Sequence, residues 1–71
     1  MKSIYADDYK KTIEKLKQAR LDAGLTQEEV SKQLNKPQSY VSKVENSQRR
    51  VDVSELKELA KLYKIDPAKL L

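Results

Sequence analysis

The sequence predicts an all-α fold, a compact bundle of about five short helices, from its apolar spacing and its lack of chain breakers. Only one glycine and two prolines occur among the 71 residues. Apolar residues recur at intervals of three and four, the pattern of amphipathic helices. A chain of this length forms one small unit. We therefore expect a single domain over residues 1–71, with residues 1–7 as a flexible N-terminal extension.

The first helix is expected to end near Gly24. Four residues precede it at steps of four, three and four: Tyr9, Ile13, Leu16 and Arg20. This spacing places them on one face of a helix. Gly24 is a natural stop, because glycine adopts the left-handed conformation that commonly ends helices without steric cost.

The second helix is expected to begin just after Thr26 and to stop at Asn35. Thr26 and Glu29 have the spacing of a capping box, in which each side chain bonds to the other residue's backbone N–H. Val30 and Leu34 face the core. Asparagine tolerates the left-handed conformation that a tight turn needs, so Asn35 predicts the end of this helix.

The third helix is predicted from Pro37 to Asn46, after a turn of only about three residues. The fixed φ of proline suits the first position of a helix. Val41 and Val44 should face the core. The second and third helices, joined so closely, are a helix-turn-helix candidate.

The last part of the chain predicts two more helices. Asp52 or Ser54 is expected to cap a fourth helix. Its apolar stripe comprises Val53, Leu56, Leu59, Ala60 and Tyr63. Asp66 and Pro67 are expected to open a fifth helix, which is short because the sequence ends at residue 71.

Composition argues against an enzyme. The chain contains no cysteine and no histidine, so it lacks thiolate ligands and the commonest general base. We expect no catalytic residue, no metal and no cofactor. No apolar run approaches the roughly 20 residues of a membrane span, and the N-terminus lacks the apolar stretch of a signal peptide. The cytoplasm is the expected location, with no membrane partner.

The charge balance favours a nucleic-acid partner without deciding it. Lysine and arginine number 15 against 11 acids, a formal net charge of +4. The segment from residue 51 onward carries as many acids as bases, so the excess lies before it. A basic excess is typical of nucleic-acid binding, but a solvated lysine-rich surface is equally consistent with charge alone.

The outward face of the helix over residues 37–46 is polar and free of acids. Its side chains suit the edges of bases in the DNA major groove, although a polar outer face is also common on soluble helices. The candidate base-reading residues are Gln38, Ser39, Ser42 and Lys43. Around them stand candidate contacts to backbone phosphate, which position a protein without specifying sequence. These are Gln27, Lys36, Arg49 and Arg50.

Arg20 and Glu45 are predicted to form an ion pair. Arg20 shares the inward face of the first helix, and Glu45 lies one turn after Val41 on the inward side of the third. Burying either charge alone would be costly. We therefore expect the pair to lock the two helices together, although two surface charges that reach solvent would fit the same pattern.

Three segments, taken together in order and spacing, resemble a known family. They are Leu25–Glu29, Gln38–Lys43 and Glu45–Asn46. With them, residues 20–71 resemble the Cro/phage-repressor (XRE-type) helix-turn-helix family. The resemblance implies a lambda-repressor-like bundle that binds double-stranded DNA sequence-specifically. It also implies a transcriptional repressor that binds a palindromic operator as a homodimer, with the third helix in the major groove.

The resemblance also implies roles for single residues. Base reading falls to Gln38, Ser39 and Lys43. Contacts to the sugar-phosphate backbone fall to Gln27, Tyr40 and Asn46. The buried pair of Arg20 and Glu45 is implied as well.

The sequence departs from the family pattern at two turns. Asn35, Lys36 and Pro37 stand where the family has glycine, an apolar residue and serine or threonine. Because that hydroxyl is missing, the helix over residues 37–46 has no side-chain acceptor at its start, and its first residue is not fixed by the pattern. Ser47 stands where glycine is common.

Other functions remain open on the sequence. An antitoxin with a toxin as partner, or a restriction–modification controller protein, would use the same DNA-binding domain. No extra segment to cover a toxin is evident in the sequence. An RNA-binding protein would need exposed stacking aromatics, and only Tyr40 lies on the predicted surface. Possible dimer-interface residues are Leu62, Leu70 and Leu71, although core positions would explain all three equally.

Overall fold

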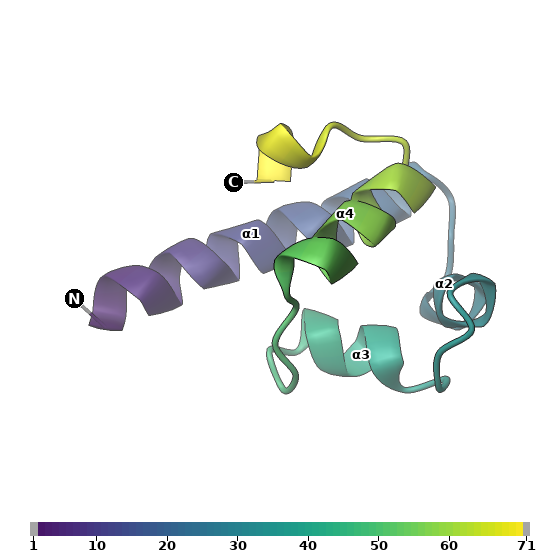
Figure 1. Ribbon diagram of the computed structural model, residues 1–71, viewed down its shortest axis with the longest axis horizontal. Coiled ribbons are helices and arrows are strands. Elements are labelled where there is room, and N and C mark those ends of the chain that lie inside the picture. The colour runs from purple at the N-terminus through teal and green to yellow at the C-terminus, as the bar shows by residue number, and fades with distance from the viewer. Residues whose placement is uncertain (1, 71) are drawn as a thin grey trace.

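The computed structural model describes residues 2–70, with side chains described from Asp8 onward (Figure 1). The elements are α1 (Lys2–Asp22), α2 (Gln27–Gln33), α3 (Tyr40–Glu45), α4 (Val53–Leu62) and the 3₁₀ helix η1 (Pro67–Leu70). No strand occurs within residues 2–70. The predicted all-α bundle is confirmed, and its fifth element is a single 3₁₀ turn.

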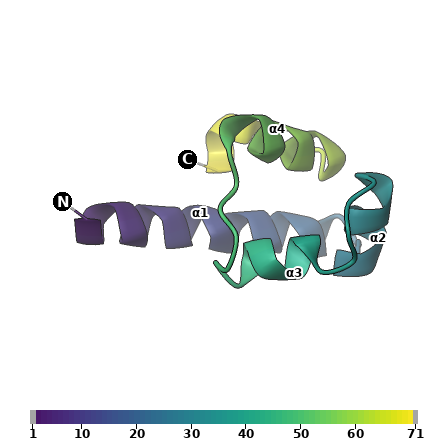
Figure 2. The same cartoon turned by 60° about the horizontal axis from the view of Figure 1, so that its bottom comes forward.

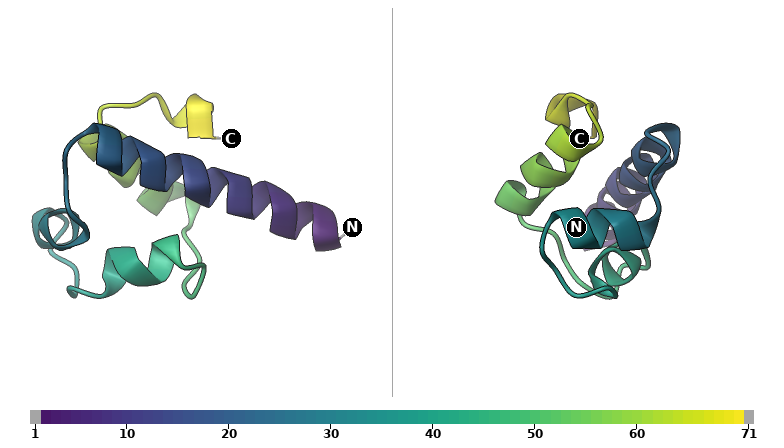
Figure 3. Two further views of the ribbon diagram at one scale, coloured as in Figure 1. Left: turned by 180° about the vertical axis from the view of Figure 1, so that it is seen from behind. Right: turned by 90° about the vertical axis from the view of Figure 1, so that its right-hand side faces the viewer.

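The longest helix, α1, forms the base on which the bundle is built. It contacts α3, α4 and η1, while α2 contacts α3. Viewed end-on, α1, α4 and the α2–α3 pair occupy three corners around the core (Figure 3). The N-terminal part of α1 extends beyond the other elements (Figure 2). Met1 lies outside the described residues, the backbone of residues 2–7 belongs to α1, and the expected flexibility of residues 1–7 stays a prediction.

The core collects apolar side chains from every helix. Its buried members are Ile13, Leu16, Ala19, Val30, Tyr40, Val41, Val44, Leu59, Ala60, Tyr63 and Leu70. Their positions confirm the predicted inward faces of the first four helices, with one exception. Within residues 2–70, no helix is both long and apolar enough to cross a membrane.

Val53 is the exception, because its side chain is 68% exposed. It is the first residue of α4, directly after the cap Asp52, whose carboxylate accepts a hydrogen bond from the Glu55 N–H. The residue that packs against the core here is Val51, which precedes the cap. Placing Val53 in the apolar stripe was therefore wrong, since the inward face of α4 begins only at Leu56.

The start of the third helix also differs from the prediction. Regular α3 begins at Tyr40, and residues 37–39 form one turn that is closed by a hydrogen bond from the Tyr40 N–H to the Pro37 carbonyl, 2.9 Å. Ser39 occupies the cap position but makes no side-chain cap bond. Placing the start at Pro37 was wrong. Without a hydroxyl cap on its own chain segment, the first turn does not continue as regular helix.

Two of the three possible interface residues are placed by the structure. Leu70 is fully buried in the core, so of the two alternatives it is a core residue. Leu62 is partly buried and packs against the core. Leu71 lies outside the described residues.

All four α-helices end in the same backbone motif. The second residue beyond the end of each helix adopts a left-handed conformation, with φ between 58° and 74°. These residues are Gly24, Asn35, Ser47 and Lys64. The N–H of the next residue donates to the carbonyl five residues back, at 2.8–3.2 Å, which is the Schellman pattern. The predicted stops at Gly24 and Asn35 are confirmed, and Ser47 adopts the conformation of the glycine that it replaces.

We expect Lys64→Gly to stabilise the protein. The left-handed conformation costs a residue with a side chain about 1 kcal/mol or more, and glycine removes that cost at the price of a more flexible unfolded chain. A net gain of about 0.5–1 kcal/mol in the free energy of unfolding should raise the melting temperature by roughly 2–8 °C, measured by circular dichroism.

Lys61→Gly is the matched control for this measurement. Lys61 is also an exposed lysine but has the helical conformation in the last turn of α4, where glycine costs up to about 1 kcal/mol, so the melting temperature should fall. A Lys64→Gly protein that melts at or below the wild-type temperature would contradict the account of this helix end.

Candidate nucleic-acid interface

The pose of α3 is fixed by a buried ion pair at its C-terminal end. Arg20 Nε lies 2.7 Å from Glu45 Oε2, and Arg20 Nη2 lies 3.2 Å from Glu45 Oε1. The side chains are only 8% and 3% exposed. The structure thus contains the predicted ion pair, and the two hydrogen bonds make it bidentate. It joins α1 to the last residue of α3.

Neighbouring groups complete the hydrogen bonding of this pair. Arg20 Nη1 donates to the Leu25 carbonyl at 2.7 Å. Gln27 Nε2 donates to Glu45 Oε1 at 2.9 Å. The start of α2 is therefore tied to the end of α3 through Gln27, whose predicted contact with phosphate stays a prediction.

Ser31 ties α2 to the other end of α3. Its side chain is buried, its hydroxyl donates to the Gln38 carbonyl, and the same oxygen accepts from the Val41 N–H, both at 3.4 Å. A serine on α2 thus supplies the acceptor that the start of α3 lacks. The sequence reasoning missed Ser31, although it lies three residues before Leu34, on the inward face of its helix.

The division of α3 into inward and outward sides follows the prediction. Val41 and Val44 are buried. Of the candidate base-reading residues, three are exposed and Ser42 is half-buried. The exposed ones are Gln38, Ser39 and Lys43. Gln38 and Ser39 lie in the turn that precedes regular α3, and Ser42 and Lys43 lie within the helix.

A cationic hollow of about 290 Å³ lies beside this face. It is lined by Lys36, Pro37, Ser39, Tyr40, Lys43 and Arg49. The Tyr40 ring lies between two of the cations, with Lys36 Nζ 5.4 Å and Arg49 Cζ 4.8 Å from its centroid. Such contacts attract a cation to the aromatic face. Three positive side chains therefore surround a space large enough for a phosphate group.

Tyr40 itself does not offer its hydroxyl to this hollow. The residue is 4% exposed, and its hydroxyl is buried without a hydrogen-bond partner. Burial raises the pKa of the Tyr40 phenol. The predicted contact of Tyr40 with the sugar-phosphate backbone stays a prediction, and in this structure the buried hydroxyl does not offer it.

The loop after α3 is held against α1 by Tyr9. The Tyr9 hydroxyl accepts a hydrogen bond from the Val51 N–H at 3.2 Å and donates to the Arg49 carbonyl at 3.5 Å. Arg50 Cζ lies 5.0 Å from the centre of the Tyr9 ring. Asn46, which ends α3, is exposed. The loop therefore presents Asn46, Arg49 and Arg50 from a fixed backbone.

Arg49 is already engaged within the protein. Its Nη1 and Nη2 donate to the two carboxylate oxygens of Glu55 at 3.1 and 2.9 Å. The bond from Arg49 lowers the pKa of the Glu55 carboxyl. A phosphate that binds Arg49 would therefore compete with Glu55 for its guanidinium. The sequence did not predict this ion pair.

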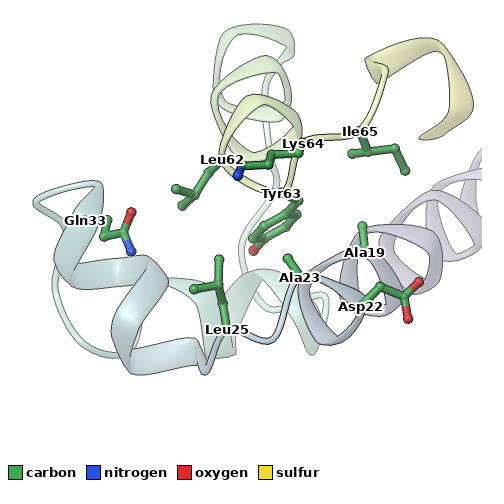
Figure 4. Close-up of a pocket in the computed structure, with 9 residues that line it drawn as sticks. All are labelled: Ala19, Asp22, Ala23, Leu25, Gln33, Leu62, Tyr63, Lys64 and Ile65. Atoms are coloured by element: carbon green, nitrogen blue, oxygen red, sulfur yellow. The ribbon is translucent and has the colours of Figure 1, made fainter.

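A second hollow, of about 610 Å³, lies between the C-terminal ends of α1 and α4 and the helix α2. Figure 4 shows its apolar side chains Leu25, Leu62 and Ile65 around the ring of Tyr63, with Asp22 pointing away from them. The Tyr63 hydroxyl is buried without a partner, and burial raises its pKa. This lining does not place a nucleophile beside a base. Among the described residues, no group of three potential metal ligands is assembled.

Comparison with known proteins agrees with this geometry. The sequence model of the helix-turn-helix family matches residues 16–70. An XRE-family like protein from Pseudomonas syringae pv. tomato str. DC3000 has a similar solved structure, with a TM-score of 0.91 and 40% sequence identity. The match covers 97% of this chain and 84% of that chain. Among curated proteins, none is significantly similar to the sequence.

We expect Arg20→Met to destabilise the fold strongly. The substitution preserves apolar bulk but leaves Glu45 charged and buried without its partner, a change that costs about 3–5 kcal/mol in other proteins. The measurement is thermal or urea-induced unfolding. Lys17→Met, an exposed lysine on α1, is the control and should change stability by less than about 0.5 kcal/mol. Equal, small losses for both variants would show that Arg20 and Glu45 act as independent surface charges.

We expect Ser31→Ala to loosen the start of α3. The Val41 N–H would lose its acceptor inside the core, at a cost of about 1–3 kcal/mol in the free energy of unfolding. Native-state hydrogen exchange should show faster exchange of the Val41 amide. Ser54→Ala, at an exposed position in α4, is the control and should leave that amide unchanged. An unchanged Val41 exchange rate in Ser31→Ala would refute the role assigned to Ser31.

Proposed function

The chain belongs to the Cro/C1-type (XRE) helix-turn-helix family of DNA-binding transcriptional regulators, and we propose that it reads a specific double-stranded sequence with α3 in the major groove. The observation that carries the proposal is the polar, acid-free outward side of the segment Gln38–Lys43. Buried contacts hold this segment at both ends, through Ser31 at the start and Glu45 at the end. A fixed helix with polar outer side chains is what base-edge recognition requires.

Each outward side chain suits a particular contact. Gln38 can form two hydrogen bonds with an adenine edge, and Lys43 can donate to guanine O6 or N7. Ser39 and Ser42 can bond to bases or to phosphates. We propose these four residues as the base-reading set, with Gln38 and Ser39 entering the groove first, since they precede the helix.

Phosphate contacts are proposed for the residues that surround this segment. Lys36 and Arg49 line the cationic hollow, and Asn46 and Arg50 lie in the loop beyond α3. Gln27 begins α2, where free backbone N–H groups also attract anions. These contacts would position α3 without specifying sequence.

We further propose that the protein acts as a homodimer on a palindromic operator and represses transcription by blocking polymerase. One short helix reads too few base pairs for strong specificity. Two copies related by a two-fold axis would read two half-sites about one helical turn apart. Two arguments support a homodimer: a palindromic operator has two-fold symmetry, and the chain belongs to this helix-turn-helix family.

The test is selection from a randomised duplex pool, followed by affinity measurements at several salt concentrations. We expect one palindromic motif to be enriched. Gln38→Ala should then relax the preference at one position of each half-site, at a cost of about 1–3 kcal/mol for the matching base. Lys36→Gln should weaken binding to every duplex and reduce the salt slope by about one unit.

Two outcomes would contradict the proposal. Equal retention of all duplexes, with no enriched motif, would exclude sequence-specific recognition. A relaxed sequence preference in Lys36→Gln and uniform weakening in Gln38→Ala would reverse the proposed roles.

A further inference from the structure

Glu55 holds its carboxylate against Arg49, one of the cations that line the hollow beside α3. Both of its oxygens accept hydrogen bonds from the guanidinium of Arg49, at 3.1 and 2.9 Å. The Glu55 side chain is 13% exposed, whereas that of Arg49 is 42% exposed. The Glu55 carboxylate is therefore largely buried beneath the Arg49 guanidinium, which remains partly exposed to solvent.

Arg49 has little freedom while Glu55 holds it. Its Nη1 also donates to the Arg50 carbonyl at 3.2 Å, and its guanidinium lies 4.8 Å from the centre of the Tyr40 ring. Three of the five N–H donors of an arginine are thus used inside the protein. Only the Nε–H and one Nη2–H remain for an external acceptor.

A carboxylate and a phosphate compete for the same N–H donors of an arginine side chain. Both accept paired hydrogen bonds from the planar guanidinium. A phosphate entering the hollow would have to displace Glu55 or bind beside a guanidinium whose charge is already balanced. Since Arg49 lowers the pKa of the Glu55 carboxyl, the acid is charged at neutral pH and the competition persists there.

We propose that Glu55 is an internal competitor of backbone phosphate for Arg49, and that it holds the DNA affinity of this surface below the value its cations would otherwise give. This inference rests on the proposed function and extends it. Glu55 acts on the part of binding that is independent of sequence, because Arg49 lies outside the base-reading segment. The carboxylate keeps a second role, since Glu55 Oε1 accepts from the Asp52 N–H in the capping box of α4, 3.1 Å.

Glu55→Gln separates these two roles. Glutamine at this position also completes a capping box, so α4 keeps its start while the negative charge is lost. We expect the variant to bind every duplex about three to ten times more tightly near 0.1 M salt. Its salt dependence should be steeper by about one unit, since one more cation would then neutralise a phosphate.

Glu58→Gln is the matched control. It makes the same charge change on an exposed residue one turn farther along α4, and it should alter affinity much less. In an Arg49→Ala background, Glu55→Gln should raise affinity much less, because only the direct repulsion between the carboxylate and phosphate is then removed. Melting curves of all variants establish that each is folded at the temperature of the binding measurement.

These measurements distinguish a failure of the proposed function from a failure of the inference about Glu55. If wild-type protein binds no duplex, the proposed function fails, and this inference with it. If wild-type binds but Glu55→Gln binds equally or more weakly, only this inference fails. Weaker binding would show that Glu55 instead positions Arg49 for phosphate. Equal gains for Glu55→Gln and Glu58→Gln, or a gain of full size in the absence of Arg49, would also overturn it.

Discussion

The buried contact between Arg20 and Glu45 is the constraint on which the rest of the structure depends. It lies where α1, the start of α2 and the end of α3 meet, and it draws in the Leu25 carbonyl and the Gln27 amide. Removing two charges from water is costly, and an apolar pair of similar size would often be as stable. What the ion pair adds is direction, because bidentate bonds fix both the distance and the angle between helices. The outward face of α3 is therefore set by contacts on its inner side.

Much of this arrangement can be predicted from the sequence, because capping residues fix the helix ends and apolar spacing fixes the inward faces. The capping box of Thr26 and Glu29 and the stops at Gly24 and Asn35 depend on neighbouring residues only. The ion pair was also predictable, since both charges fall on inward faces. The candidate base-reading side chains follow in the same way, once Val41 and Val44 are assigned to the core.

The features that the sequence did not predict depend on contacts between elements, which the pattern within one element does not show. The start of α3 is completed by Ser31 from another helix, which no pattern within residues 37–46 can indicate. Periodicity extends the α4 stripe to Val53, but it cannot say where the core ends. Tyr40 was assigned by resemblance, and only packing shows that its ring fills the core beneath Lys36 and Arg49. The Arg49–Glu55 bond likewise joins a loop to the next helix.

The central claim is that the Arg20–Glu45 pair serves orientation more than stability, and one double variant tests it most directly. In Arg20→Met with Glu45→Met, no charge is left buried alone, so the protein should fold and melt within about 1–2 kcal/mol of wild type. Its affinity for the duplex motif selected by wild type should nevertheless fall at least tenfold, while its affinity for random duplexes changes little. Wild-type affinity and selectivity in a folded double variant would contradict the claim that this pair positions α3.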